Sequence, residues 1–211
     1  MRKIMMIFIV LSLVFSGSLL AEGLGLGLTT GINMSKFVGD DAEEFLEGIN
    51  AKFKTGFAFG GFLTIPVGRL DGRVEALFSQ NGAKYEGVED GAEASIKFNL
   101  NSLSIPITAG LNVLPNLRVF AGPYFDIFLS GQTMIEFSFE GVSFDEDEDI
   151  EGEDVATVAM GIIVGAAYSI FDNLEVELRM NRGLNSLDAT DDELDFKPSV
   201  ISARVNFYLI R

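Results

Sequence analysis

The chain has 211 residues, a length that suits one domain, and its 31 acidic against 15 basic side chains give a formal charge of −16. Nucleic-acid binding is excluded, because it requires a basic surface that this composition does not supply. There is no cysteine and no histidine, which excludes disulfides, thiol catalysis, histidine general bases and histidine metal ligands. Beyond the N-terminus, no apolar run approaches the ~20 residues of a membrane-spanning helix.

The first 21 residues have the pattern of a secretory signal peptide. Arg2 and Lys3 precede an apolar run over residues 4–15, and small residues then lead to Ala21. We expect cleavage after Ala21, with Ser18 as the alternative position and an uncleaved helical anchor as the alternative function. No cysteine follows the apolar run, so a lipid anchor is not expected. The predicted organisation is a signal peptide over 1–21 and one domain over 22–211.

The remainder of the chain alternates apolar and polar residues with a period of two, which predicts β-strands. The clearest pair flanks the turn at Pro115 and Asn116, with apolar residues on one face and small, hydroxyl or charged residues on the other. An apolar face that continues for about ten residues exceeds the strands of most soluble sheets and is typical of transmembrane barrels. In chain order, the pattern predicts eight strands over residues 24–34, 55–67, 72–82, 95–113, 117–130, 155–170, 174–181 and 201–209.

The fourth strand changes phase partway along its length. Ile96, Phe98 and Leu100 are apolar at even positions, whereas from Leu103 onward the apolar residues occupy odd positions. An extra residue in a strand shifts its alternation by one, so a β-bulge at residues 101–102 is predicted.

The predicted connections alternate between long and short. The four long ones, at residues 36–54, 82–94, 134–154 and 185–197, hold 24 of the 31 acidic residues, and residues 40–47 are expected to form a short surface helix. Long charged loops at one end and tight turns at the other are typical of outer-membrane barrels. The predicted fold is therefore all-β: an eight-stranded antiparallel up-and-down transmembrane β-barrel with short periplasmic turns and long acidic extracellular loops. A soluble periplasmic lipocalin-like carrier, with its apolar side chains facing a ligand, is the alternative.

Four short motifs occur in order along the middle of the chain. They are L-S-I-P-I at 103–107, A-G-P-Y at 121–124, M-G-I-I-V-G-A-A-Y at 160–168 and R-M-N-R-G-L-N at 179–185. Together they resemble the PorT-like outer-membrane β-barrel proteins of Gram-negative bacteria. The resemblance implies an outer-membrane location and an eight-stranded barrel, but a fold does not imply an activity. The chain departs from the usual barrel ending on an aromatic residue, because its last residues are Leu209, Ile210 and Arg211.

Charged residues also occur on the face of the strands that is predicted to line the lumen. Four are basic and four acidic: Arg73, Arg118, Arg179, Arg204, Glu75, Asp126, Glu175 and Glu177. Unpaired charges are costly to bury, so these groups are expected to form ion pairs. Side chains about fill the interior of an eight-stranded barrel. The sequence therefore predicts a plugged lumen, with a narrow gated channel as the alternative.

The longest acidic run is a candidate for attracting cations. It comprises Asp145, Glu146, Asp147, Glu148 and Asp149. Carboxylate oxygens are ligands for Ca²⁺ and Mg²⁺, but the run lacks the ligand spacing and the glycine of an EF-hand loop. Diffuse attraction of divalent cations is therefore favoured over a defined metal site, and no cofactor is expected.

Catalysis is not predicted. The hydrolytic sites known in enzymatic barrels resemble Asp-His or Ser-His arrangements, which this chain cannot build, and Glu175 and Glu177 are expected to pair with arginines. The predicted role is structural, adhesive or surface-binding, with outer-membrane lipid and an extracellular partner as the expected contacts. A narrow channel or a secretion-associated barrel is the alternative.

Overall fold

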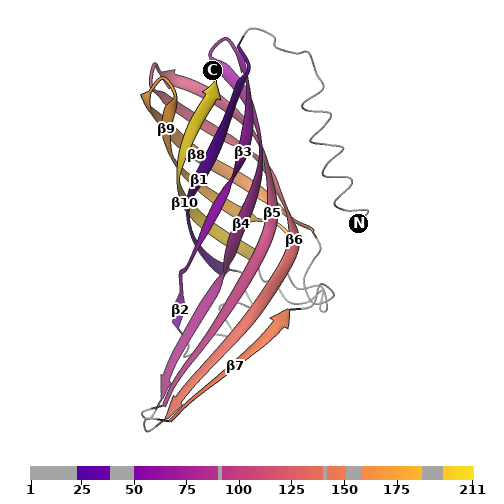
Figure 1. Cartoon of the computed structure of the whole chain (residues 1–211), viewed down its shortest axis with the longest axis vertical. Coiled ribbons are helices and arrows are strands. Elements are labelled where there is room, and N and C mark those ends of the chain that lie inside the picture. Colours follow the sequence, from indigo (N-terminus) through magenta and orange to yellow (C-terminus); the bar gives the residue numbers. More distant parts are fainter. Residues whose placement is uncertain (1–22, 39–49, 90–91, 140–141, 151–157, 187–196) are drawn as a thin grey trace.

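The computed structural model describes residues 23–38, 50–89, 92–139, 142–150, 158–186 and 197–211. All the secondary-structure elements assigned within these ranges are β-strands (Figure 1). The strands are β1 (Gly25–Val38), β2 (Asn50–Lys52), β3 (Lys54–Val67), β4 (Leu70–Glu89), β5 (Ala92–Leu114), β6 (Leu117–Phe139), β7 (Val142–Ile150), β8 (Val158–Phe171), β9 (Leu174–Gly183) and β10 (Lys197–Ile210). The predicted signal peptide and the predicted helix at 40–47 lie outside the described residues.

Eight of these strands form a closed antiparallel ring. The ring follows the order β1, β3, β4, β5, β6, β8, β9 and β10, in which each strand pairs with its neighbours. The pairing of β10 with β1 closes the barrel. The two remaining strands are attached to the ring: β2 pairs with β4 and β7 pairs with β6. The predicted eight-stranded up-and-down barrel is confirmed, including short turns after β3, β5 and β8.

The two faces of the ring differ in polarity as predicted. The outward side chains form an exposed apolar belt that includes Leu28 on β1, Phe59 on β3, Leu178 on β9 and Val205 on β10. The inward side chains are mostly small, polar or charged, and they are buried. A lipocalin-like carrier requires the reverse arrangement, so that alternative is wrong. No helix in the described part of the chain is long and apolar enough to cross a membrane.

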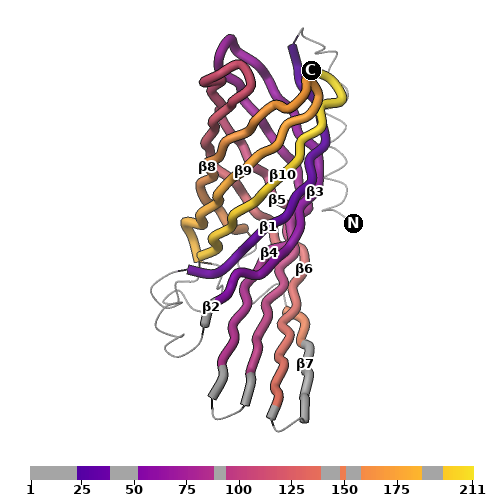
Figure 2. Tube along the Cα trace, turned by 90° about the vertical axis from the view of Figure 1, so that its left-hand side faces the viewer, coloured from indigo at the N-terminus to yellow at the C-terminus, as the bar shows by residue number. Residues whose placement is uncertain are grey.

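Two segments that the sequence analysis treated as polar loops, 82–94 and 134–154, are largely strands. β4 and β5 continue to a hairpin at Glu89 and Ala92, and β6 continues to Phe139, where β7 folds back along it. We call residues 82–89, 92–100, 131–139 and 142–150 the protruding sheet; it extends beyond the barrel at the end opposite the short turns (Figures 1 and 2). The sequence analysis missed these strands because their residues are polar. A hairpin outside a membrane needs no apolar face towards lipid.

A register shift lies where the bulge was predicted. Asn101 pairs with Ser130 and the next residue, Ser102, pairs with Phe128, which leaves Leu129 as an extra residue. The predicted location is confirmed, but the extra residue belongs to β6 and not to β5. On the other side of β5 the pairing with β4 continues without a shift through Asn101 and Ser102. β5 therefore keeps the same positions facing the lumen on both sides of this point.

This geometry explains the phase change in the sequence of β5. The even positions face inward throughout, and they change from Ser104 and Ser102 inside the barrel to Leu100, Phe98 and Ile96 in the protruding sheet. On β6, the extra residue turns the apolar odd positions inward beyond Leu129. The outward positions of the sheet carry charges instead, with Lys84 paired to Glu86 and Lys97 paired to Glu136. The polarity of the two faces thus inverts where the strands leave the apolar belt.

Glycines on β8 make room for aromatic rings in the lumen. An ideal Cβ on Gly165 would lie 2.4 Å from Cζ of Phe120 and 2.6 Å from the backbone oxygen of Leu178. Gly165→Ala is therefore expected to lower the free energy of unfolding by about 1–3 kcal/mol through overpacking. The control is Gly72→Ala, because a Cβ at that exposed position meets nothing within 4 Å. Urea unfolding in lipid vesicles measures the stability of both variants. Equal unfolding midpoints would contradict the close packing at Gly165.

Candidate functional site

The charged residues of the lumen come from two strands on opposite walls of the barrel. Arg73 and Glu75 are two residues apart on β4, and Glu175, Glu177 and Arg179 follow the same spacing on β9. Successive side chains of a strand alternate between its faces, so each set points to one side, here the lumen. Three ring strands separate β4 from β9 in either direction around the barrel. Contacts between the two sets must therefore cross the lumen.

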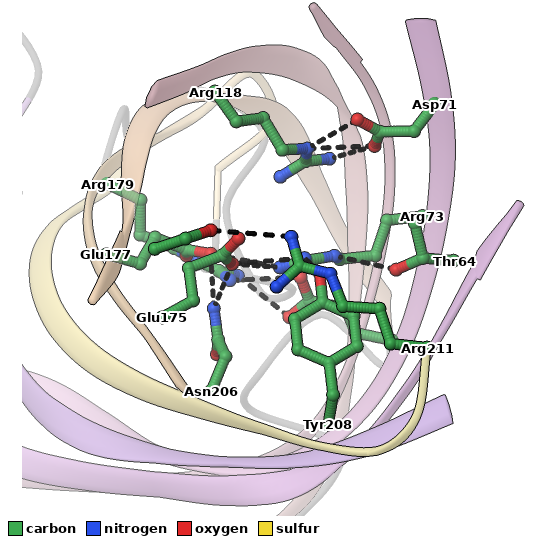
Figure 3. Close-up of polar contacts among 12 residues, drawn as sticks. Thr64, Asp71, Arg73, Arg118, Glu175, Glu177, Arg179, Asn206, Tyr208 and Arg211 are labelled. Atoms are coloured by element: carbon green, nitrogen blue, oxygen red, sulfur yellow. Dashed lines mark hydrogen bonds and ion pairs between the residues drawn. The ribbon is translucent and has the colours of Figure 1, made fainter. Parts of the chain in front are cut away.

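These five residues, which we call the lumen cluster, form a connected set of ion pairs. Both terminal nitrogens of Arg73 donate to Oε1 of Glu175 at 3.0 Å, and Nη1 also contacts Oε2 of Glu177 at 3.3 Å. Arg179 donates from Nη1 and Nη2 to the two oxygens of Glu75, each at 2.9 Å, and also pairs with Glu177. All five side chains are buried, and Figure 3 shows contacts of the cluster across the barrel.

Neutral groups satisfy further hydrogen-bonding positions of the lumen cluster. Asn206 donates from Nδ2 to Glu175 at 2.8 Å and to Glu177 at 3.0 Å (Figure 3). The Arg73 Nε donates to the Thr64 hydroxyl at 3.1 Å, and its Nη2 donates to the Tyr208 hydroxyl. Bidentate arginine–carboxylate pairs with additional hydrogen bonds are the arrangement in which buried charges are best compensated.

Arg118 pairs with a residue that the sequence analysis missed. Its Nε lies 2.8 Å from Oδ1 and 2.9 Å from Oδ2 of Asp71 (Figure 3). Asp71 is the second residue of β4, next to the short turn that follows β3. The predicted strand over residues 72–82 starts one residue after Asp71, although Asp71 precedes Arg73 by two positions and therefore shares its face. That spacing is the signal that could have identified it.

Two predicted members do not join these pairs. Neither Arg204 nor Asp126 makes an ion pair shorter than 4 Å with a described residue, and Nε and Nη1 of the buried Arg204 have no hydrogen-bond partner. The expectation that all eight charges pair is therefore wrong for these two. For Arg204 the physical reason is competition: Glu75 and Glu177, which attract it, are already bonded to Arg179.

Uncharged side chains occupy further parts of the lumen. Phe120, Tyr124, Ile163 and Ala167 form a buried apolar group. A separate hydrogen-bonded group centres on Asn33, whose Nδ2 donates to the Ser79 hydroxyl at 3.1 Å and whose Oδ1 accepts from the Ser202 hydroxyl at 2.8 Å. A cavity of about 30 Å³ lies near the end that carries the protruding sheet. Charged, apolar and polar side chains are therefore all found in the lumen.

The acidic run at 145–149 lies on β7, at the edge of the protruding sheet. Glu148 and Asp149 are exposed, whereas the side chains of residues 145–147 lie outside the described part of the structure. Within the described residues, no group of three acidic, histidine or cysteine side chains is placed to hold a metal ion. Diffuse attraction of divalent cations by this run stays a prediction.

Comparisons with known proteins identify the family. The family described as outer membrane protein beta-barrel domain matches residues 16–189. Comparison with curated protein sequences finds no match. Among solved structures, Neisserial surface protein A has 12% identity and a TM-score of 0.49, with 88% of this chain and 99% of that chain covered. Ail, the attachment invasion locus protein of Yersinia pestis, has 12% identity and a TM-score of 0.45, with 89% and 99% covered.

A third similar structure is the outer membrane protease OmpT from Escherichia coli, with 12% identity, a TM-score of 0.41 and coverage of 92% of this chain and 99% of that chain. The family match spans well over half of the sequence. This chain accordingly belongs to the outer membrane protein β-barrel domain family and is a protein of the outer membrane.

Proposed function

We propose that this protein is a non-enzymatic outer-membrane barrel with a plugged lumen, which acts through its outer surface in a structural, adhesive or binding role. One observation carries the proposal: the ion pairs of the lumen cluster connect β4 to β9 across the barrel. A solute that passed through would have to displace these pairs and leave buried charges uncompensated. The same pairs occupy Glu175 and Glu177, so neither carboxylate is available as a general base.

Solute uptake by proteoliposomes tests the plug. In a solution of a small sugar, vesicles that contain the purified protein are expected to swell no faster than empty vesicles. Vesicles with an open porin serve as the positive control. Swelling of the wild-type vesicles at the porin rate would overturn the plugged lumen and favour the channel alternative.

The protruding sheet is the surface that we propose for binding. It extends beyond the barrel at the end with long connections, which in outer-membrane barrels is the extracellular end. Ile135 and Phe137 on its inner face are 40% and 41% exposed. Exposed apolar groups away from the lipid belt are a common feature of protein interaction sites.

Adhesion of bacteria to epithelial cells tests this surface role. Cells that express Ile135→Ser/Phe137→Ser are expected to adhere less than cells that express the wild type at equal surface levels. The matched control is Ile201→Ser/Val205→Ser on the lipid-facing belt. Equal adhesion of the wild type, the protruding-sheet variant and a non-expressing strain would argue for a purely structural role.

We also propose kinship with the PorT-like barrels. The four motifs that carry the resemblance fall on β5, β6, β8 and β9, with the last motif continuing two residues beyond β9, and these strands are consecutive neighbours in the ring. A secretion-associated role remains the alternative that this kinship suggests, with a secretion partner at the membrane. Deletion of the gene is expected to leave the proteins in the culture medium unchanged; their retention in the periplasm would favour secretion.

A further inference from the structure

The cavity at the protruding-sheet end of the lumen has two chemically different parts. Its wall is formed largely by apolar side chains, which include Phe37, Leu100, Phe128 and Pro198. Asp126 and Ser102 contribute polar atoms to the same cavity. A mainly apolar pocket with a few convergent polar groups is the usual form of a small-molecule site.

Asp126 supplies the charged group of this cavity. Its carboxylate forms no ion pair shorter than 4 Å with a described residue, and its buried Oδ1 has no hydrogen-bond partner. Arg204 attracts Asp126 electrostatically but forms no ion pair shorter than 4 Å with it. A carboxylate without an ion pair among largely apolar side chains is costly, and this cost falls when a cation occupies the cavity.

The apolar wall of the cavity continues outward onto the protruding sheet. The Phe37 ring lies 6.1 Å from the Phe98 ring, and Phe98 in turn contacts Tyr85 edge-on at 6.0 Å. Phe98 and Tyr85 belong to the inner face that the polarity inversion makes apolar. An apolar chain that starts at the cavity would therefore have aromatic rings beside it along its length.

The size of the cavity restricts the group that can bind beside Asp126. About 30 Å³ of accessible space accommodates roughly two water molecules. That volume suits a primary ammonium and its first methylene, and it is small for a planar guanidinium. The net charge of −16 raises the local concentration of cations at the protein surface.

We propose that this cavity binds a primary ammonium group carried on an apolar chain, with the ammonium donating to the Asp126 carboxylate and the chain lying against Phe37 and Phe98. The site goes beyond the surface role proposed above, because it requires only the cavity at the protruding-sheet end and none of its lining residues belongs to the lumen cluster. Its ligand class is a cationic amine with an unbranched hydrocarbon body.

Hexylamine is the probe, and hexanol is the matched uncharged ligand of the same length. Calorimetric titration into the protein in lipid nanodiscs at pH 7 is expected to give saturable 1:1 binding of hexylamine, roughly tenfold tighter than hexanol because of the charge-assisted hydrogen bond. Asp126→Asn is expected to remove that preference. Asp149→Asn, which neutralises an exposed acid on β7, is expected to preserve it.

A second variant keeps the proposal testable if Asp126→Asn does not fold. Ala159→Leu would fill the cavity without changing its charge, since Ala159 is buried and lines it. This variant is expected to lose binding of both probes. Equal affinity for hexylamine and hexanol in the wild type would overturn the proposal, and so would hexylamine binding that neither variant weakens.

Discussion

Arg179→Met is expected to lower the free energy of unfolding by about 3–5 kcal/mol, because it leaves the buried Glu75 carboxylate without its partner and removes one of the two arginines that pair with Glu177. Arg179 holds both oxygens of Glu75 and also pairs with Glu177, and all three side chains are buried. Methionine keeps the length of the side chain and removes its charge. Urea unfolding in lipid vesicles, followed by circular dichroism because the chain has no tryptophan, measures the loss.

Arg211→Met is the matched control for this prediction. Arg211 is exposed at the short-turn end, where its guanidinium stacks on Tyr208 at 4.5 Å and contacts the Ser169 hydroxyl. Exposed contacts of this kind contribute at most about 1 kcal/mol. The double variant Arg179→Met/Glu75→Gln is expected to regain part of the loss, because the stranded charge of Glu75 is removed. Similar unfolding of the Arg179 and Arg211 variants would show that the lumen cluster does not stabilise the barrel.

Val205→Arg is expected to cost about 2–4 kcal/mol of folding free energy in a bilayer, the penalty of a charge on the lipid-facing side of a barrel. Val205 lies on β10 between Thr30 and Val176 on the neighbouring strands and is 43% exposed. The same vesicle assay gives the measurement.

Ser95→Arg is the control for depth. Ser95 lies on the outer side of the protruding sheet, where the register places it between Glu86 and Glu136. An arginine there remains beside two acidic residues and outside the apolar belt, so we expect almost no loss of stability. If both arginine substitutions cost the same, the apolar belt would not be the part that contacts lipid.

The sequence was sufficient to predict the eight strands of the ring, their faces and the tight turns, because period-two alternation is a local property. It placed Arg73 and Glu175 inside the barrel for the same reason. It could not determine their pairing, because they are 102 residues apart and meet only when the ring closes. Asp71 was missed because aspartate is common in turns. Its place two residues before Arg73 puts it on the inward face of β4, and this alternation determined its position.

The phase change of β5 shows a second limit of sequence analysis. Apolar residues move from even to odd positions for either of two reasons: an extra residue in the strand, or a change of surroundings along a regular strand. Ile96 and Phe98 look the same in the sequence in both cases. Only the continuous pairing of β5 with β4 distinguishes them, and it shows that the surroundings change. The strands at 82–94 and 134–150 escaped prediction because their polar residues resemble those of loops.

Single-channel recording in planar bilayers tests most directly the claim that ion pairs across the lumen close this barrel. We predict no sustained current from the wild-type protein over the usual range of voltages. We predict measurable openings from Arg73→Ala/Arg179→Ala, if its native fold is retained, because those changes remove both arginines that connect β4 to β9. A steady conductance from the wild type, unchanged in that variant, would contradict the account.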